Sequence, residues 1–102
     1  METFNFDEAF SRNLGWLTKK ELQILRNKRI AIAGLGGVGG IYALTLARLG
    51  IGKMTLADPD IFELANFNRQ IGATLDSIGK NKSEVISDLV HKINPEIDIR
   101  LF

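Results

Sequence analysis

Three short apolar segments have the lengths and compositions of β-strands. Residues 30–33 form a continuous apolar run, residues 54–57 form a second apolar segment, and Ile97, Ile99 and Leu101 alternate with charged residues. A continuous run is typical of a central parallel strand covered on both faces, so we expect residues 30–33 to form such a strand. Alternation is typical of a half-exposed strand, which favours an outer edge of the sheet for the third segment.

The N-terminal part of the chain carries the signals of a short helix. Thr18 and Glu21 have the spacing of a capping box, and Leu17 and Leu22 occupy the positions of a hydrophobic staple around it. These signals predict a helix that begins after Thr18 and ends near Asn27.

Two longer helices follow the first and second strands. Residues 38–49 are apolar nearly all round and are followed by Gly50, which suits a helix end, so we expect a buried helix there. Residues 82–93 place their apolar side chains on one stripe, as in a helix with one buried face. The connection before this last helix is polar. It predicts an ordered crossing loop at residues 63–70 and a local helix at residues 75–78.

Helices and strands alternate in the order α-β-α-β-α-β. Right-handed crossovers convert this order into a parallel sheet with strand order 3-2-1, the first half of a Rossmann-like three-layer α/β fold. We expect a single domain. Residues 1–28 would form its N-terminal helical segment, and residues 29–102 would form the N-terminal half of a nucleotide-binding domain.

The free edge of the first strand is a physical problem for this fold. A flat apolar edge is normally covered, and a doubly wound sheet places its fourth strand there, next to the nucleotide crevice. We therefore expect either that the chain is a piece of a longer protein, or that the N-terminal helices or another subunit cover this edge.

A glycine-rich turn, GLGGVG, separates the first strand from the helix that follows it. Glycine permits the tight turn, lets the backbone approach a phosphate, and lets the helix pack close to the strand. The unpaired N–H groups of the first helical turn then face the phosphate. With an acidic residue at the end of the second strand, the turn indicates nucleotide binding, and a purely structural turn is the alternative. Its glycines are Gly34, Gly36, Gly37 and Gly39.

Charged and polar residues outside this turn extend the candidate site. Asp58 is placed either to bind ribose hydroxyls or to solvate a turn, and Asp60 is ambiguous between capping, ribose contact and solvation. Arg69 can present two parallel donors to a phosphate, and Lys82 and Arg12 add positive charge. The alternative for each cation is a solvated surface charge. Three amide side chains surround Arg69 in sequence, at Asn66, Asn68 and Gln70.

Composition and charge exclude several classes of protein. Thirteen basic and twelve acidic residues give a net charge of +1, which favours no nucleic-acid partner. The absence of cysteine excludes disulfides, thiolate zinc sites and cysteine nucleophiles. The single histidine, His91, suits a helix-end surface position, and we predict no metal site. Residues 1–7 lack a signal-peptide pattern and no stretch is apolar enough to span a membrane. We therefore expect a soluble cytoplasmic protein without membrane contact.

Together these motifs resemble the ThiF/MoeB family of adenylyltransferases, which are related to the ubiquitin-activating enzymes. Nicotinamide dehydrogenases share only the glycine turn and the acidic strand end. The resemblance covers about residues 10–102 and rests on the glycine turn, DPD at 58–60, NFNRQ at 66–70, Gly79 with Lys82, and INP at 93–95.

The resemblance implies an enzyme that binds ATP and magnesium. In it, the C-terminal carboxylate of a ubiquitin-like or sulfur-carrier protein attacks the α-phosphate and releases pyrophosphate. The resemblance further implies that Gly37 and its neighbours line the nucleotide, that Asp58 holds the ribose, and that Arg69 and Lys82 contact the phosphates. Arg12 resembles the arginine that each subunit of a family homodimer lends to its partner. The other expected nucleotide contacts are Asp60, Asn66 and Gln70.

The same resemblance limits what this chain does alone. The family's magnesium-associated aspartate follows the fourth strand, so we expect the 102 residues by themselves to adenylate nothing measurably. Two alternatives remain: an NAD(P)- or FAD-binding half of an oxidoreductase, and a non-catalytic nucleotide-binding module. Loss of Arg69 or Lys82 should harm an ATP site but have little effect on an oxidoreductase.

Overall fold

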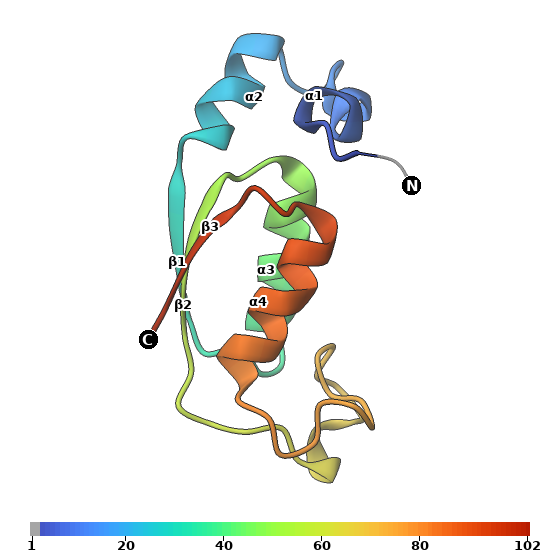
Figure 1. Cartoon of the computed structure of the whole chain (residues 1–102), viewed down its shortest axis with the longest axis vertical. Coiled ribbons are helices and arrows are strands. Elements are labelled where there is room, and N and C mark those ends of the chain that lie inside the picture. Colours follow the sequence, from blue (N-terminus) through green and yellow to red (C-terminus); the bar gives the residue numbers. More distant parts are fainter. Residues whose placement is uncertain (1–2) are drawn as a thin grey trace.

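The computed structural model describes residues 3–102 as a three-stranded sheet with helices on one face and a helical segment at one end (Figure 1). The strands are β1 (Arg29–Ala33), β2 (Lys53–Ala57) and β3 (Asp98–Leu101). β2 lies in the centre and pairs in parallel with both neighbours. The predicted α/β class and the strand order 3-2-1 are therefore confirmed.

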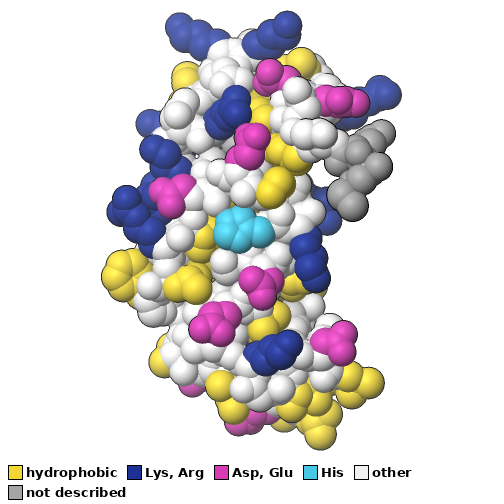
Figure 2. Space-filling view, viewed as in Figure 1, with side chains coloured by type: hydrophobic (Ala, Val, Ile, Leu, Met, Phe, Trp, Pro, Cys, Tyr) yellow, Lys and Arg dark blue, Asp and Glu magenta, His cyan; other side chains and the backbone are white. Residues whose placement is uncertain are grey.

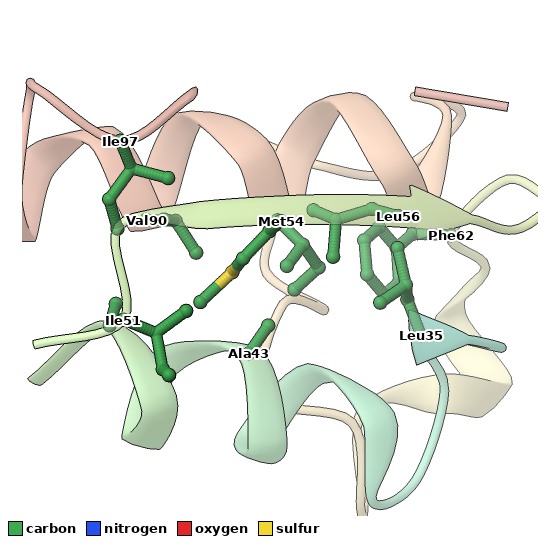
Figure 3. Packing of buried hydrophobic residues seen from close by; sticks show 10 residues of the cluster. Leu35, Ala43, Ile51, Met54, Leu56, Phe62, Val90 and Ile97 are labelled. Atoms are coloured by element: carbon green, nitrogen blue, oxygen red, sulfur yellow. The ribbon is translucent and has the colours of Figure 1, made fainter. Parts of the chain in front are cut away.

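Two crossover helices, α3 (Gly39–Leu49) and α4 (Lys82–Ile93), cover the same face of the sheet and pack against each other (Figure 1). Gly50 ends α3 in the left-handed conformation, with a φ of 109°, as predicted for a helix-terminating glycine. The main core lies between these helices and the central strand (Figure 3). Its fully buried side chains include Ala43, Met54, Leu56, Ile86 and Val90.

Two predictions about burial were wrong. β1 was expected to be covered on both faces, but Ala31 and Ala33 are exposed. The helix after it was expected to be buried, but Ile41 and Tyr42 on α3 are exposed. Both errors have one cause. Residues 3–102 supply helices to one face of the sheet only, so apolar side chains that would suit a second layer face solvent.

The N-terminal segment contains α1 (Phe6–Ala9), a 3-10 turn η1 (Ser11–Asn13) and α2 (Lys19–Arg26). The predicted capping box is formed: the Thr18 hydroxyl accepts from the Glu21 N–H at 3.1 Å, and the Glu21 carboxylate accepts from the Thr18 N–H at 2.9 Å. These helices lie beyond the amino ends of the strands and leave the free edge of β1 uncovered (Figure 1).

The crossing loop leads from β2 to α4 and includes the 3-10 turn η2 (Leu64–Asn66). The local helix expected at residues 75–78 is absent, because Ser77 organises a turn there: its hydroxyl accepts from the Thr74 N–H at 2.8 Å and donates to the Gly72 carbonyl at 2.6 Å. No helix within residues 3–102 is long and apolar enough to cross a membrane.

Candidate nucleotide site

The glycine turn lies at the carboxyl ends of β1 and β2, where Gly34 donates its N–H to the Ala57 carbonyl at 2.8 Å. Gly34 has a φ of 88°, in the region that favours glycine. A Cβ on Gly39 would overlap the carbonyl oxygen of Gly34. The start of α3 can therefore approach β1 only because both positions are glycine.

Gly36 and Gly37 have different surroundings. A Cβ on Gly36 would lie 3.2 Å from the Gln70 amide nitrogen, whereas a Cβ on Gly37 would have no neighbouring atom within 4 Å. Gly37 thus leaves its backbone open to an approaching group. The N-terminal end of α3, with its unpaired N–H groups, follows directly.

Asp58 connects the turn to the end of β2. Its buried carboxylate accepts one hydrogen bond from the Leu35 N–H at 2.7 Å and another from the Asp60 N–H at 2.9 Å. The Asp60 carbonyl in turn accepts from the Lys82 N–H at 2.9 Å. This series of hydrogen bonds joins the glycine turn to the start of α4, so Asp58 has a structural role whether or not it also contacts a ribose.

Lys82 is the most unusual charge in the site. It is the first residue of α4, behind an N-cap in which the Asn81 side chain accepts from the Ser83 N–H at 3.0 Å. Lys82 is only 7% exposed, and no acceptor within residues 3–102 forms a hydrogen bond or ion pair with its ammonium. A lysine held in a largely buried position with an unpaired ammonium is available to an anionic ligand, so this position favours one.

The crossing loop places Gln70 beside the glycine turn, and Arg69 precedes it in the chain. Gln70 is buried against Gly36, and its Oε1 atom lacks a partner among the described residues. Arg69 is exposed, and its Nη1 donates to the Ala65 carbonyl and the Asn68 side chain, both at 3.0 Å. Asn66 caps η2, because its Oδ1 accepts from the Glu63 N–H at 2.8 Å.

Arg12 lies at the other end of the molecule. It belongs to η1, where the neighbouring Asn13 side chain donates to the Arg48 and Leu49 carbonyls at 3.1 Å. Those carbonyls end α3, whose opposite end carries the glycine turn about 16 Å away. A single chain therefore does not combine Arg12 with Lys82, although it brings the other predicted site residues to one end.

Sequence reasoning missed Phe62. The ammonium of Lys82 lies over the ring of this residue, 5.6 Å from its centroid, and the ring is fully buried. The sequence offers no specific signal for it, because Phe62 is one of several large apolar residues in the loop between β2 and α4.

Residues 3–102 do not form a magnesium site. They contain no cluster of three or more His, Asp or Glu side chains able to hold a metal ion, and both Asp58 oxygens accept backbone hydrogen bonds. This chain therefore provides no basis for assigning magnesium a position.

Comparison with known proteins identifies the family. The ThiF family pattern matches residues 10–102. The chain belongs to the ThiF family. It is 39% identical over 90 residues to the tRNA threonylcarbamoyladenosine dehydratase of Bacillus subtilis, covering 88% of this chain and 35% of the relative. It is 44% identical over 80 residues to ubiquitin-like modifier-activating enzyme 5 of Drosophila ananassae, covering 78% of this chain and 20% of the relative.

Solved structures of ThiF-family relatives resemble the fold closely. The Escherichia coli tRNA N6-threonylcarbamoyladenosine dehydratase in complex with ATP matches with a TM-score of 0.91 and 38% identity, covering 94% of this chain and 40% of that one. The same enzyme has been solved with AMP. The chain thus spans 20–40% of the length of these relatives.

Proposed function

We propose that this chain is the ATP-binding part of an enzyme that activates a carboxylate as an acyl-adenylate. The observation that carries the proposal is the position of Lys82, a 7% exposed residue whose ammonium has no anionic partner within residues 3–102 and whose backbone N–H is joined through Asp60 and Asp58 to the glycine turn. Membership of the ThiF family and relatives solved with ATP and AMP support the same conclusion.

Each part of the site has a role in this proposal. The backbone around Gly37 and the N-terminal end of α3 receive the phosphates, and Arg69 and Lys82 neutralise their charge. Asp58 and Asp60 contact the ribose, while Asn66 and Gln70 hold the loop against the nucleotide. Arg69 must exchange its contacts with Ala65 and Asn68 for phosphate oxygens.

The reaction needs alignment and charge neutralisation more than proton transfer. A carboxylate oxygen of the substrate forms a bond to the α-phosphorus, and the bond from that phosphorus to the pyrophosphate oxygen breaks. The nucleophile is already an anion, so no general base is required. Positive groups lower the barrier by stabilising charge on the α-phosphate and the departing pyrophosphate.

The carboxylate belongs, in our proposal, to the C-terminus of a ubiquitin-like or sulfur-carrier protein. The similarity to ubiquitin-like modifier-activating enzyme 5 supports this substrate class. The similarity to tRNA threonylcarbamoyladenosine dehydratases favours a second candidate, the carboxylate of a threonylcarbamoyl group on tRNA. Both substrates present a carboxylate to the same ATP site, so the site alone does not separate them.

Arg12 completes the site from a second copy of the chain in this proposal. Its position at the far end of α3 prevents it from reaching the nucleotide of its own chain, but a symmetric homodimer would bring it to the partner's triphosphate. The magnesium ion and its aspartate ligand would then come from outside residues 3–102.

Calorimetric titration of the 102-residue chain with ATP, AMP and NAD tests the proposal. We expect ATP to bind more tightly than AMP or NAD. Lys82→Ala should weaken ATP binding at least about tenfold, because it removes a positive charge and its hydrogen bonds from the phosphates. Lys92→Ala is the matched control, since Lys92 is exposed near the other end of α4, and it should leave ATP affinity unchanged. Tighter binding of NAD than ATP, or equal effects of the two substitutions, would contradict the proposal.

A further inference from the structure

We propose that Phe62 is a positioning residue that holds the Lys82 ammonium in place for the phosphates without neutralising it. The inference rests on the proposed ATP site and adds a residue to it. Lys82 has one specific side-chain interaction among the described residues, the contact of its Nζ with the Phe62 ring face at 5.6 Å from the centroid. That distance lies within the range of a cation–π interaction.

The Phe62 ring is itself fixed from several sides. Its backbone N–H donates to the Lys80 carbonyl at 3.0 Å, and its carbonyl accepts from the Gly79 N–H at 2.9 Å. The ring is fully buried beside Leu56 and Leu35 (Figure 3). A rigid ring therefore lies between the core and the ammonium.

Gly72 makes room for this ring. A Cβ at Gly72 would lie 2.6 Å from the Phe62 Cζ atom, so a larger residue there would displace it. Leu35, which lies beside the ring, is part of the glycine turn and donates its N–H to Asp58. The ring thus fixes the ammonium relative to the turn that would bind the same triphosphate.

The choice of an aromatic ring has an electrostatic consequence. A carboxylate would also hold the ammonium, but it would cancel most of the field that attracts phosphate. A ring face attracts the cation through its quadrupole and leaves the net charge at +1. A lysine held in this way keeps both its orientation and its full charge for an anionic ligand.

One variant and one control separate positioning from general stability. Phe62→Leu removes the ring face and retains an apolar core residue. Phe67→Leu is the control, because Phe67 is an exposed phenylalanine of the same loop. We expect Phe62→Leu to weaken ATP binding about fivefold, equivalent to about 1 kcal/mol for a cation–π contact. Phe67→Leu should bind ATP as the wild type does.

A spectroscopic signature tests the contact without ATP. The Lys82 Nζ lies over the ring face, so we expect the NMR resonances of the adjoining ε-methylene protons to be shifted upfield from those of the exposed lysines. This shift should vanish in Phe62→Leu and persist in Phe67→Leu. Wild-type Lys82 resonances without an upfield shift would overturn the inference, even if the leucine variant failed to fold.

The two proposals fail in different ways. In one outcome, Lys82→Ala abolishes ATP binding, whereas Phe62→Leu changes the Lys82 resonances and leaves ATP affinity intact. This result would support the ATP site and overturn the positioning role of Phe62. If the wild type shows the ring-shifted lysine yet binds no nucleotide, the proposed function and the role of the ring in phosphate binding fall together.

Discussion

At the scale of single residues, the glycines of the turn serve different purposes that the sequence pattern does not distinguish. Gly39 is required by packing against Gly34, Gly36 lies against Gln70, and Gly37 faces open space. The motif correctly predicted a turn between a strand and a helix. Only the three-dimensional structure distinguishes Gly39, which packing requires, from Gly37, which a bound ligand would require.

Alanine substitutions at these positions should therefore have opposite effects. Gly39→Ala forces a methyl group onto the Gly34 carbonyl and should lower the free energy of unfolding by about 2 to 3 kcal/mol. Gly37→Ala should change it by less than about 0.5 kcal/mol, because the methyl group meets nothing. The same methyl group would occupy the path of a phosphate, so ATP affinity should fall. Urea denaturation and calorimetry measure the two effects, and unchanged ATP affinity in Gly37→Ala would argue against phosphate binding there.

Asp58 provides a second prediction at this scale. Asp58→Asn replaces one acceptor oxygen with an NH2 group that faces a backbone N–H, so it should destabilise the chain by about 1 to 3 kcal/mol. Asp60→Asn is the matched control. Because the Asp60 side chain is exposed, this variant should have the same free energy of unfolding as the wild type. A fully stable Asp58→Asn variant with weakened ATP binding would show that the carboxylate serves the ribose alone.

At the scale of secondary-structure elements, the two sides of β1 have different backbone environments. The Lys28 carbonyl accepts from the Lys53 N–H, and the Gly34 N–H donates to the Ala57 carbonyl. The backbone groups of the even-numbered residues from 28 to 34 therefore face β2. Backbone groups alternate in direction along a strand. The N–H and carbonyl groups of Arg29, Ala31 and Ala33 therefore point to the free edge, where an apolar groove of about 380 Å³ lies between β1 and α3.

Proline substitutions should reveal this difference. Ala31→Pro removes an N–H that faces the free edge, so the free energy of unfolding should change by less than about 1 kcal/mol. Ile32→Pro removes a hydrogen bond to β2 together with core packing, and should cost about 3 kcal/mol or more. Thermal denaturation of the two variants gives the comparison. Equal destabilisation would mean that the free edge of β1 is paired in solution.

At the scale of the whole molecule, large hydrophobic side chains are exposed on the loop between β2 and α4. Figure 2 shows such side chains gathered at the lower end, and six large apolar residues of the crossing loop are exposed. This apolar surface belongs to the same loop that carries Arg69 and Gln70 of the candidate site. The six residues are Ile61, Leu64, Phe67, Ile71, Leu75 and Ile78.

Periodicity and capping signals were enough to predict the bounds of the longer helices, because these depend on local sequence, whereas the strand order was predicted from the alternation of elements and the handedness of their crossovers. The α4 bounds, the Thr18 capping box and the Gly50 helix end all follow from residues close in the chain. Burial was predicted less well, since the exposure of Ala31 and Tyr42 depends on which layers are present. Phe62 was missed because a ring beneath a lysine is a tertiary relationship between different segments.

The position of Arg12 leads to a prediction about two copies of the chain. If Arg12 serves the partner's triphosphate, an Arg12→Ala chain and a Lys82→Ala chain are each defective but complement each other when mixed. Half of the randomly mixed dimers are heterodimers with one intact site of two, so about a quarter of the wild-type number of tight ATP sites should return. Calorimetric stoichiometry measures this number, and the double variant Arg12→Ala/Lys82→Ala mixed with either single variant is the control that should restore none. Two results would contradict sharing of the site: as many tight ATP sites in the control as in the mixture of single variants, or none in that mixture. A complete set of cations forms only where the Lys82→Ala chain supplies its Arg12 to the site that retains Lys82.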